Sequence, residues 1–416
     1  MTDVQFTRRT FLQTSGSAIA MTSPLIVSSN VFGANEKINL GFIGVGRRGS
    51  QLMGDFRRLK DAQFVAISDL YKPRMDKIAG ENNWKKYQDY RQLLDSSEVD
   101  AVVIATPDHW HALPSIHACM AGKDVYVEKP MTLTIAEGRA MVKAARKYER
   151  IVQCGSQQRS MKECRIGCEL VRNGKIGKIH TIHTSIFPSP WDQPFPAQPV
   201  PDGLDWNTWL GPTPERAYHT DLFTPRAKPG WISIVTYSGG EATGWGAHGL
   251  DLIQWAMGMD ASGPVEIWTE GGNPLELDRP VFMRYANGAV LKCDGKGPQG
   301  GAVFEGENGT ITIDRGRFET KPDKLTEEDL ADAEDKLEVS QNHQQNWLDC
   351  IRSRKLPIAD VEVGHRSTTV CHLVNIARWT HRKLNWDPEK EIFTGDKDAT
   401  TYIDRPRRSP WELPEI

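Results

Sequence analysis

The feature that most constrains the fold is a glycine-rich turn that directly follows a short apolar run. Residues 38–43 form the run, and Gly44, Gly46 and Gly49 follow it in a G-x-G-x-x-G pattern. Between a strand and a helix, such glycines permit a tight turn, close approach of a phosphate and close helix packing. The phosphate then lies at the free N–H groups of the helix N-terminus. The pattern predicts a dinucleotide-binding Rossmann unit, although glycines in an ordinary loop would carry no such meaning.

A second apolar strand, expected over residues 63–68, ends at Asp69. A carboxylate at this place in a Rossmann unit accepts hydrogen bonds from the adenosine ribose and repels a 2′-phosphate. The alternative is that Asp69 only caps the next helix. We expect NAD as the cofactor. NADP stays open, because Arg47, Arg48 and Lys72 are near in the sequence and could bind a phosphate.

Strand and helix patterns alternate from Asp69 as far as residue 154. The strands are continuous apolar runs, as expected of strands buried on both faces of a parallel sheet. The alternation predicts an α/β fold with a doubly wound parallel sheet, which binds ligands at the carboxyl ends of its strands. The expected strands cover 100–105, 124–127 and 151–154, and the expected helices cover 72–80, 90–95, 110–121 and 134–148.

Two of these strand ends carry candidate site residues. The first reads TPDHWH over residues 106–111, and the second reads EKP over residues 128–130. A lysine at this edge could bind a substrate hydroxyl and move its proton, whereas most lysines are ordinary surface residues. Two histidines suggest a metal, but no third ligand is near them in the sequence, so we expect no metal site. The predicted cofactor contacts here are Thr106, Pro107, His109, His111, Glu128 and Lys129.

The first 34 residues form a separate segment. Residues 7–12, TRRTFL, are a twin-arginine pattern, and an uncharged, mildly apolar stretch follows as far as about residue 31. We interpret residues 1–34 as a Tat export signal, with a basic N-terminus of no signalling role as the alternative. The stretch is too polar to span a membrane stably. We therefore expect an exported protein, in the periplasm, at the cell surface or outside the cell, that holds its NAD tightly.

Composition bears on the classes of partner. The net charge is −3 over 416 residues, so we expect neither nucleic acid nor an anionic membrane as a partner. The seven cysteines are scattered without a C-x-x-C pair, which argues against a disulfide framework and a cysteine metal site. Cys164 and Cys168 are four residues apart in an expected helix, and we interpret them as two half-buried thiols.

The second half of the chain carries further candidate side chains. Gln157 and Arg159 follow the last strand of the Rossmann pattern and could bind the cofactor or substrate hydroxyls. Residues 245–258 form an expected helix that includes His248. A histidine suits general-base chemistry because its ordinary pKa is about 6.5, but a buried structural histidine is the alternative. Asp251 comes three residues later and should share a helix face with His248.

A stretch rich in proline and tryptophan covers residues 188–229. Aromatic faces suit sugar rings. For any one tryptophan, anchoring of an irregular segment is the preferred interpretation. The polar tail over 396–416 should wrap the body of the protein or a neighbouring subunit. Strands are expected from 178 and over 265–269, 281–285, 289–294 and 303–313, a charged excursion over 321–338, and helices over 161–173, 343–352 and 367–382.

The motifs together resemble those of the Gfo/Idh/MocA oxidoreductase family. The resemblance rests on the glycine turn, on residues 105–111 and 128–130, and on WGAHGLD over 245–251, which occur in family order. It extends over essentially the whole chain after the N-terminal segment. It implies a Rossmann domain, placed at 36–155, and a C-terminal substrate-binding α/β domain, placed at 156–416, with a large, open, mostly antiparallel sheet.

The resemblance also implies an activity and its residues. It implies hydride transfer between a nicotinamide and a hydroxyl of a carbohydrate or cyclitol. Lys129 matches the catalytic lysine of the family, and His248 matches the histidine of its second catalytic motif. Many members carry an aspartate four residues before that histidine, where this chain has Gly244. Either Asp251 or Glu241 could supply a carboxylate instead. The predicted substrate contacts are Arg159, Trp245 and Asp251.

Three hypotheses follow from these patterns. The first is an exported NAD-dependent oxidoreductase that acts on a small sugar or sugar derivative and forms a homo-oligomer. The second is a redox-neutral enzyme that cleaves a glycoside through a keto-sugar, by oxidation, elimination and return of the hydride. The third is a sugar- or cofactor-binding protein without catalysis, which the presence of both Lys129 and His248 disfavours.

Overall fold

The structure is a computed structural model that describes residues 37–416, apart from residues 228, 272 and 274. The segment over residues 1–34 lies outside the described residues, so its interpretation as an export signal stays a prediction. Among the described helices, none is both long enough and apolar enough to cross a membrane. The same part of the chain holds no group of three or more histidine, cysteine or carboxylate side chains that could bind a metal ion.

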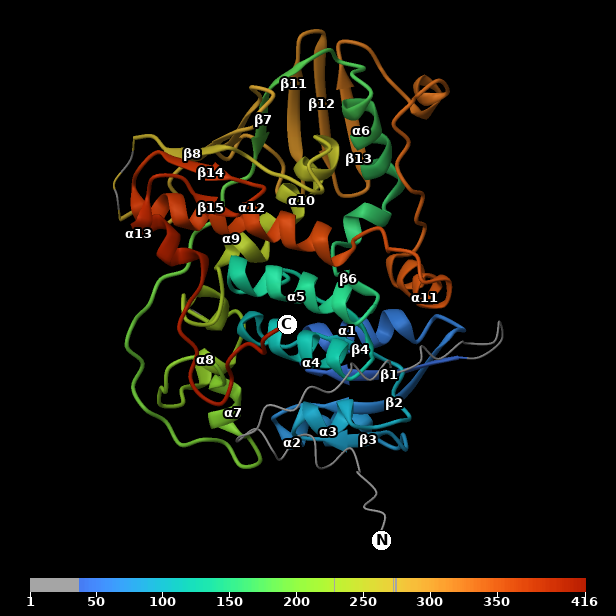
Figure 1. Ribbon diagram of the computed structural model, residues 1–416, viewed down its shortest axis with the longest axis vertical. Helices are drawn as coiled ribbons and strands as arrows, with labels where there is room; N and C mark the ends of the chain where they lie inside the picture. The colour runs from blue at the N-terminus through green and yellow to red at the C-terminus, as the bar shows by residue number, and fades with distance from the viewer. Residues whose placement is uncertain (1–36, 228, 272, 274) are drawn as a thin grey trace, which may run out of the picture. The chain divides into compact units, whose positions relative to one another are not determined.

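Six parallel strands form the first sheet, shown in blue to teal in Figure 1. The strands are β1 (Ile38–Ile43), β2 (Ala62–Ser68), β3 (Lys85–Tyr87), β4 (Ala101–Ile104), β5 (Asp124–Val127) and β6 (Val152–Cys154), and the helices between them are α1 (Arg47–Phe56), α2 (Lys72–Ala79), α3 (Tyr90–Leu94), α4 (Ala112–Met120) and α5 (Ile135–Lys147). Their order, β3-β2-β1-β4-β5-β6, reverses between β1 and β4. Ligands of such sheets bind at this reversal. The predicted doubly wound parallel sheet is confirmed.

Alternate residues of the central strands point into two different apolar cores. Val102 packs with α3, α4 and α5, whereas Val103 packs with α1 on the opposite face. The second core also takes Trp347 from α11 (His343–Ser353), a helix from the far end of the chain. The apolar core of the Rossmann layer therefore includes a segment outside the predicted 36–155 range.

A second sheet has nine strands in the order β13-β12-β11-β7-β10-β9-β8-β14-β15. The pairings are antiparallel except that of β7 with β10. This large, mostly antiparallel sheet is the one that the family resemblance implies. Its strands are β7 (Ile179–Thr184), β8 (Glu266–Thr269), β9 (Val281–Arg284), β10 (Val290–Cys293), β11 (Ala302–Gly306), β12 (Gly309–Asp314), β13 (Arg317–Lys321), β14 (Leu384–Asp387) and β15 (Ile392–Phe393).

Three helices lie against the second sheet: α6 (Lys162–Arg172), α10 (Gly246–Ala256) and α12 (Val361–Thr380). α12 contacts α5 of the first sheet on one side and β8 and β9 on the other. Figure 1 shows α12, in orange-red, between the two layers. One helix therefore packs against both halves of the chain. The short helices are α7 (Trp206–Leu210), α8 (Thr220–Phe223), α9 (Glu241–Gly244) and α13 (Lys397–Thr400).

Several element predictions were wrong at their ends. α12 begins at Val361 and not near residue 367, because Asp360 caps the helix by accepting from the backbone N–H of Glu362 at 3.1 Å. The expected helix over 245–258 is α10, which covers only Gly246–Ala256, and the separate turn α9 precedes it. No strand was predicted over Arg317–Lys321, which forms β13 and ends where the expected charged excursion over 321–338 begins. Cys164 and Cys168 are fully buried, not half-buried.

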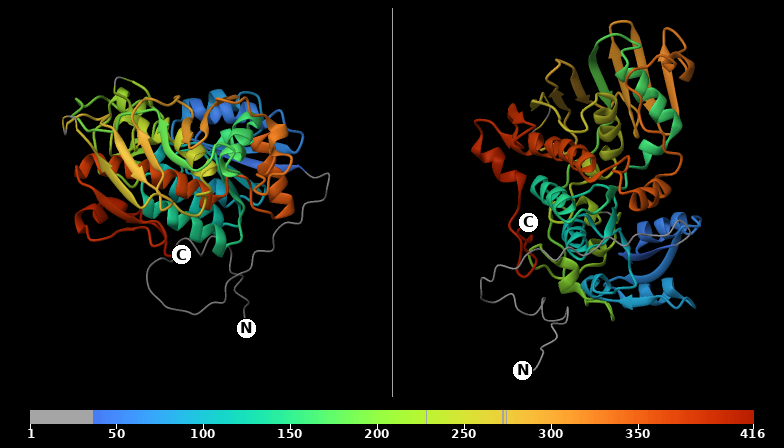
Figure 2. Two further views of the ribbon diagram at one scale, coloured as in Figure 1. Left: turned by 90° about the horizontal axis from the view of Figure 1, so that it is seen from above. Right: turned by 45° about the vertical axis from the view of Figure 1, so that its right-hand side comes forward.

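The proline- and tryptophan-rich stretch and the C-terminal tail pack against the Rossmann layer. Trp206 stacks on Trp209 with ring centroids 4.5 Å apart, and both are buried. Trp411 in the tail meets the edge of Trp110 at 6.3 Å. Figure 2 shows the tail, in red, descending to the helices of the first sheet. The tail thus wraps the body of its own chain, one of the two predicted alternatives.

Candidate active site

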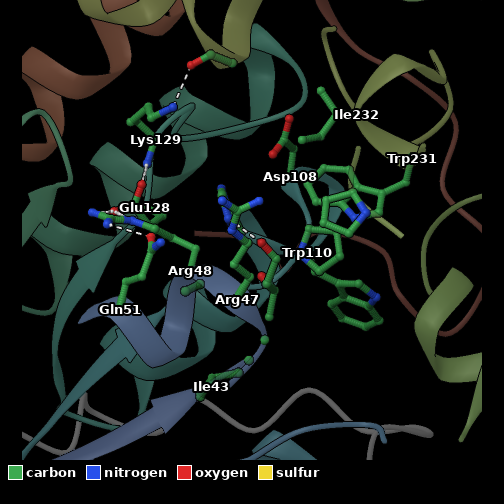
Figure 3. Close-up of a pocket in the computed structure, with 18 of the residues that line it drawn as sticks. Ile43, Arg47, Arg48, Gln51, Asp108, Trp110, Glu128, Lys129, Trp231 and Ile232 are labelled. Carbon is green, nitrogen blue, oxygen red and sulfur yellow. Dashed lines mark hydrogen bonds and ion pairs between the residues drawn. The ribbon is translucent and has the colours of Figure 1, made fainter. Parts of the chain in front are cut away.

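A cavity of about 790 Å³ opens at the carboxyl ends of β1, β4 and β5 (Figure 3). Its other wall comes from the segment that contains Trp231 and from the α9–α10 turn. The cavity lies at the strand-order reversal, where a Rossmann sheet binds its ligand. Thirteen of the predicted site residues line it: Gly44, Gly46, Arg47, Arg48, Asp69, Thr106, Pro107, His111, Glu128, Lys129, Gln157, Trp245 and His248.

The glycine turn has the geometry that a dinucleotide phosphate needs. Gly44 has a φ of 82°, and a Cβ there would lie 2.9 Å from the backbone of Ala105. A Cβ on Gly49 would lie 2.0 Å from the carbonyl oxygen of Gly44, so Gly49 shapes the turn without lining the cavity. Within the described part of the chain, a Cβ on Gly46 would come within 4 Å of Arg74 alone, at 3.8 Å. The N–H groups of the first turn of α1 have no side-chain cap and remain available to an anion.

Asp69 is fixed at the end of β2 by three donors. Its carboxylate accepts from the backbone N–H of Val45 at 3.0 Å and of Tyr71 at 2.9 Å, and it pairs with Arg74 at 3.2 Å. The N-cap of α2 is Tyr71, so Asp69 is not the cap of that helix. Arg48, a possible phosphate ligand, instead pairs with Glu128 at 2.7 Å. Asp69 is thus held at the cavity wall.

Lys129 joins the two halves of the site. Its Nζ donates to the carbonyl oxygen of Gly244 at 2.6 Å, as the dashed line in Figure 3 shows. Burial lowers the pKa of Lys129, although the nearby carboxylates of Glu128 and Asp108 oppose that shift. Glu128 accepts from Arg48 and, at 3.2 Å, from Gln157. Glu128 therefore fixes the side chains of Arg48 and Gln157. The ammonium of Lys129 has N–H donors besides the one bonded to Gly244, and these can bind a ligand.

His248 lies at the start of α10 with 8% of its surface exposed. Its ring is 5.7 Å from that of Trp245. Burial and the positive charges of Lys129, Arg315 and Arg48 hold the pKa of His248 well below its ordinary value. The imidazole is therefore neutral at physiological pH, and one ring nitrogen is an acceptor. No hydrogen bond to this ring is found within the described residues.

The two histidines of the 106–111 motif have different surroundings. His111 places one ring nitrogen 2.7 Å from the carbonyl oxygen of Pro130 and the other 2.9 Å from that of Thr106. It thus ties the loop after β4 to the loop that carries Lys129. His109 is bonded to the carbonyl oxygen of Trp209 at 2.8 Å, and burial lowers its pKa to about 4. His109 does not line the cavity, so its prediction as a cofactor contact needs correction.

Arg159 and Asp251 also need correction as substrate contacts. They form a buried ion pair at 2.9 Å, and Asp260 adds a second carboxylate at 2.8 Å from Arg159. The hydroxyl of Ser367 donates to Asp251 at 2.6 Å. The guanidinium of Arg159 lies over the ring of Trp255 at 5.2 Å. Although Asp251 follows His248 by three residues, these contacts turn it away from the cavity.

Glu241 is the other carboxylate considered in place of an aspartate at position 244. It pairs with Arg226 at 3.0 Å. A Cβ built on Gly244 would lie 3.0 Å from Oε2 of Glu241, so this carboxylate occupies space beside that glycine. Glu241 does not line the cavity.

The cavity also contains residues that the sequence prediction missed as site residues: Arg74, Asp108, Trp231 and Arg315. Arg315 lies over the ring of Trp245 at 5.0 Å and donates to Gln158 at 2.8 Å. It comes from the turn between β12 and β13, so no nearby motif marked it. Asp108, in contrast, stands inside the 106–111 motif and could have been chosen from its place at a strand end.

The Rossmann layer and the cavity at its strand-order reversal define a dinucleotide-binding protein. Residues 38–156 match the family described as "Oxidoreductase family, NAD-binding Rossmann fold", and residues 188–413 match its "C-terminal alpha/beta domain". The chain therefore belongs to the Gfo/Idh/MocA oxidoreductase family, and its first domain is an NAD-binding domain.

Individual relatives are similar at moderate identity. Myo-inositol 2-dehydrogenase of Thermotoga maritima is 25% identical over 264 residues, which cover 62% of this chain and 68% of the relative. A glycosyl hydrolase family 109 protein of Shewanella baltica is 27% identical over 201 residues, 41% of this chain and only 44% of the relative. The WlbA dehydrogenase of Bordetella pertussis, solved with NADH and UDP-GlcNAcA, superposes with a TM-score of 0.63 at 20% identity, over 85% and 98% of the two chains.

Proposed function

We propose that the protein is an exported NAD-dependent oxidoreductase that moves a hydride between the nicotinamide and a hydroxyl-bearing carbon of a sugar or sugar derivative. The observation that carries the proposal is the contact of Lys129 with Gly244, four residues before His248, in the cavity that the glycine turn also lines. A relative named myo-inositol 2-dehydrogenase supports a polyhydroxylated substrate.

The chain's own side chains suit the proton part of this reaction. The bound dinucleotide supplies the hydride acceptor. Lys129 would hydrogen-bond the reacting hydroxyl and exchange its proton. Burial lowers the pKa of Lys129, so its amine becomes neutral at a lower pH than that of an exposed lysine. His248 would donate a hydrogen bond from its ring N–H to the oxygen of the same hydroxyl, since its ring is neutral and lines the cavity. Glu128 keeps Arg48 and Gln157 in place beside Lys129.

The residues present fit a dinucleotide. The uncapped first turn of α1 would take the pyrophosphate, with Arg47 beside it. Asp69 would accept from the adenosine ribose, and its charge favours NAD over NADP. Arg74, which Asp69 holds at 3.2 Å, keeps NADP open as the alternative because it could face a 2′-phosphate.

A second candidate function is redox-neutral cleavage of a glycoside through a keto-sugar. The similarity to glycosyl hydrolase family 109 proteins favours it. In this reaction a sugar carbon is oxidised, the neighbouring C–H becomes acidic, the glycosidic group is eliminated, and the hydride returns to the sugar. The same Lys129 and His248 would serve the oxidation step.

Export has a consequence for the cofactor. The Tat pathway, suggested by the arginine pair at residues 8 and 9, carries folded proteins, so NAD would be loaded before export. Little free dinucleotide exists outside the cytoplasm. We therefore propose that the site holds NAD tightly and regenerates it in place. Replacement of both arginines by lysine should leave the protein in the cytoplasm, as cell fractionation would show; unchanged export would contradict the Tat assignment.

One experiment separates the two candidate functions. The protein is purified in its exported form, its NAD content is measured, and it is incubated with a panel of sugars and aryl glycosides. Net formation of NADH would support the oxidoreductase. Release of the aglycone without net NADH would support redox-neutral cleavage. A purified protein that contains no dinucleotide and does not bind one would contradict both.

A further inference from the structure

Asp108 is a buried carboxylate that the proposed proton chemistry does not use. It begins the 3₁₀ turn Asp108–Trp110 that follows β4, and 5% of its surface is exposed. Its Oδ2 accepts from the hydroxyl of Ser238 at 2.6 Å. Within the described part of the chain, Oδ1 has no hydrogen-bond partner, and it is not among the polar atoms sealed from solvent. This oxygen therefore faces the cavity that Asp108 lines.

The other buried carboxylates of the cavity wall differ from Asp108. Both oxygens of Asp69 accept from protein donors, and Oε1 and Oε2 of Glu128 likewise accept from protein donors. The free oxygen of Asp108 is open to the cavity, so a hydroxyl of a bound ligand can donate to it in place of water. Burial raises the pKa of Asp108, whereas the charges of His111 and Lys129 oppose that shift.

The position of Asp108 favours the substrate over the cofactor as the source of that donor. Figure 3 shows its carboxyl group beside Ile232, on the side of the cavity where Trp231 also lies. Ser238, Trp231 and Ile232 belong to the second half of the chain. Lys129 lines the same cavity and is close enough for its charge to act on Asp108.

We propose that Asp108 binds a second hydroxyl of the substrate, besides the hydroxyl that meets Lys129 and His248. The site would thus select sugars and cyclitols that present two free hydroxyls in a fixed relation. A carboxylate oxygen is acceptor-only and forms strong, charge-assisted hydrogen bonds with hydroxyl donors. The proposal rests on the proposed function and adds a specificity residue to it.

The test compares Asp108→Asn with the control Ser238→Ala. The asparagine keeps the volume and an oxygen for Ser238, but it turns an N–H₂ donor to the cavity. The control keeps the Asp108 carboxylate and removes the Ser238 hydroxyl, which donates to Asp108 and accepts from the backbone N–H of Gly240 at 3.1 Å. The probes are D-glucose, D-galactose, N-acetyl-D-glucosamine and myo-inositol, each with its monodeoxy analogues. Two quantities are measured: kcat/KM for hydride transfer, and the sugar dissociation constant from tryptophan fluorescence, since Trp110, Trp231 and Trp245 line the cavity.

For the best sugar, one monodeoxy analogue should lose on the order of 10- to 100-fold in kcat/KM and in affinity with the wild-type protein. In Asp108→Asn, kcat/KM and affinity for the parent sugar should fall by a similar factor. The same variant should bind and turn over the deoxy analogue no more than about threefold worse than the parent sugar, because the hydrogen bond is already absent. Ser238→Ala should keep the wild-type ranking. NAD affinity should be unchanged in both variants.

The proposal would be overturned if, in Asp108→Asn, every monodeoxy analogue lost as much kcat/KM and affinity relative to its parent sugar as in the wild type. It would also be overturned if Asp108→Asn weakened NAD binding as much as sugar binding. The same holds if Ser238→Ala changed the sugar ranking as Asp108→Asn does. If the wild type binds sugars but transfers no hydride, the proposed function fails, and the fluorescence arm still decides on Asp108. If no probe binds at all, the hydroxyl-binding role of Asp108 fails as well.

Discussion

Two groups of charged side chains in this protein have opposite hydrogen-bonding states. Around Arg159, the carboxylates of Asp251 and Asp260 and the hydroxyl of Ser367 form a closed set with 1% of the arginine exposed. Around Lys129, the carbonyl oxygen of Gly244 is the only direct partner of the ammonium among the residues that the structure describes. The first set is complete without a ligand, whereas the second leaves donors and acceptors open to the cavity.

The pKa values of the two cations shift in opposite directions. Burial acts to lower the pKa of Arg159, but its two carboxylates outweigh burial and raise that pKa. For Lys129, burial prevails and the pKa falls. A fixed charge serves structure, and an easily lost proton serves chemistry. We therefore infer that the Arg159 set stabilises the fold and the Lys129 set carries the reaction.

The largest expected effect is on the rate, after removal of the amine. Lys129→Met should lower kcat/KM for hydride transfer by about 10³- to 10⁴-fold, because the proton loses its exchange partner. The midpoint of thermal unfolding should stay near that of the wild type. Lys143→Met, on the exposed side of α5, is the matched control and should keep full activity. A Lys129→Met enzyme within tenfold of the wild type would remove Lys129 from the mechanism.

The next effect is on stability, in the closed set. Arg159→Met leaves Asp251 buried without its cation and should lower the free energy of unfolding by about 3–5 kcal/mol. The control is Arg317→Met, whose exposed side chain is 3.6 Å from Asp314. It should change stability by no more than about 0.5 kcal/mol. Both are measured by denaturant unfolding of the purified protein. Equal stabilities of the two variants would contradict the structural role of Arg159.

The third prediction concerns pH. Sugar oxidation needs the unprotonated amine of Lys129, so the rate should rise with pH up to that residue's pKa, which lies below the ordinary 10.5. Sugar reduction needs the ammonium, so its rate should fall as pH rises through the same value. His248 should add no limb near pH 6.5, because its pKa lies well below that value. Rate profiles in both directions check the sign, and the limb should vanish in Lys129→Met.

The smallest expected effect is on cofactor affinity. Gly46→Ala places a methyl group where, among the described residues, only Arg74 comes within 4 Å, in the turn proposed to hold the pyrophosphate. It should weaken NAD binding by about tenfold, roughly 1.4 kcal/mol, without unfolding the protein. Gly54→Ala, in α1 with no atom near its Cβ position, is the control. That control should keep the affinity and gain up to about 1 kcal/mol of stability. Unchanged affinity in Gly46→Ala would move the phosphate away from this turn.

The contrast between the two groups also explains what the sequence could predict. The glycine turn, Asp69 and Lys129 follow from local order, since each stands at the end of an apolar strand and parallel strands bring their ends to one edge. The parallel sheet was predictable for the same reason. Residues whose place depends on long-range packing were assigned wrongly. Asp251 is near His248 in the sequence, yet its partners are Arg159 and Ser367, which no local pattern connects to it.

Other parts of the site had no local signal at all. Arg315 reaches the cavity from a hairpin turn, and its neighbour Trp245 comes from another segment of the chain. The role of Trp347 in the Rossmann core depends on a helix that returns from the second half. β13 was not predicted because its exposed residues are charged and its inward face contributes a single apolar side chain, Phe318, so the strand shows little apolar alternation. These features depend on tertiary contacts that one sequence does not display.

The most direct test of hydride transfer at the Lys129 cavity is isotopic. The purified protein is incubated with sugars and cyclitols deuterated at every carbon and quenched within a single turnover. Its dinucleotide is then released for mass spectrometry. The wild type is expected to place one deuterium on the nicotinamide ring, whether the overall reaction is net oxidation or redox-neutral. Lys129→Met should place little there in the same time. A wild-type protein that holds NAD and binds these compounds, yet leaves the nicotinamide free of deuterium, would contradict hydride transfer at this site.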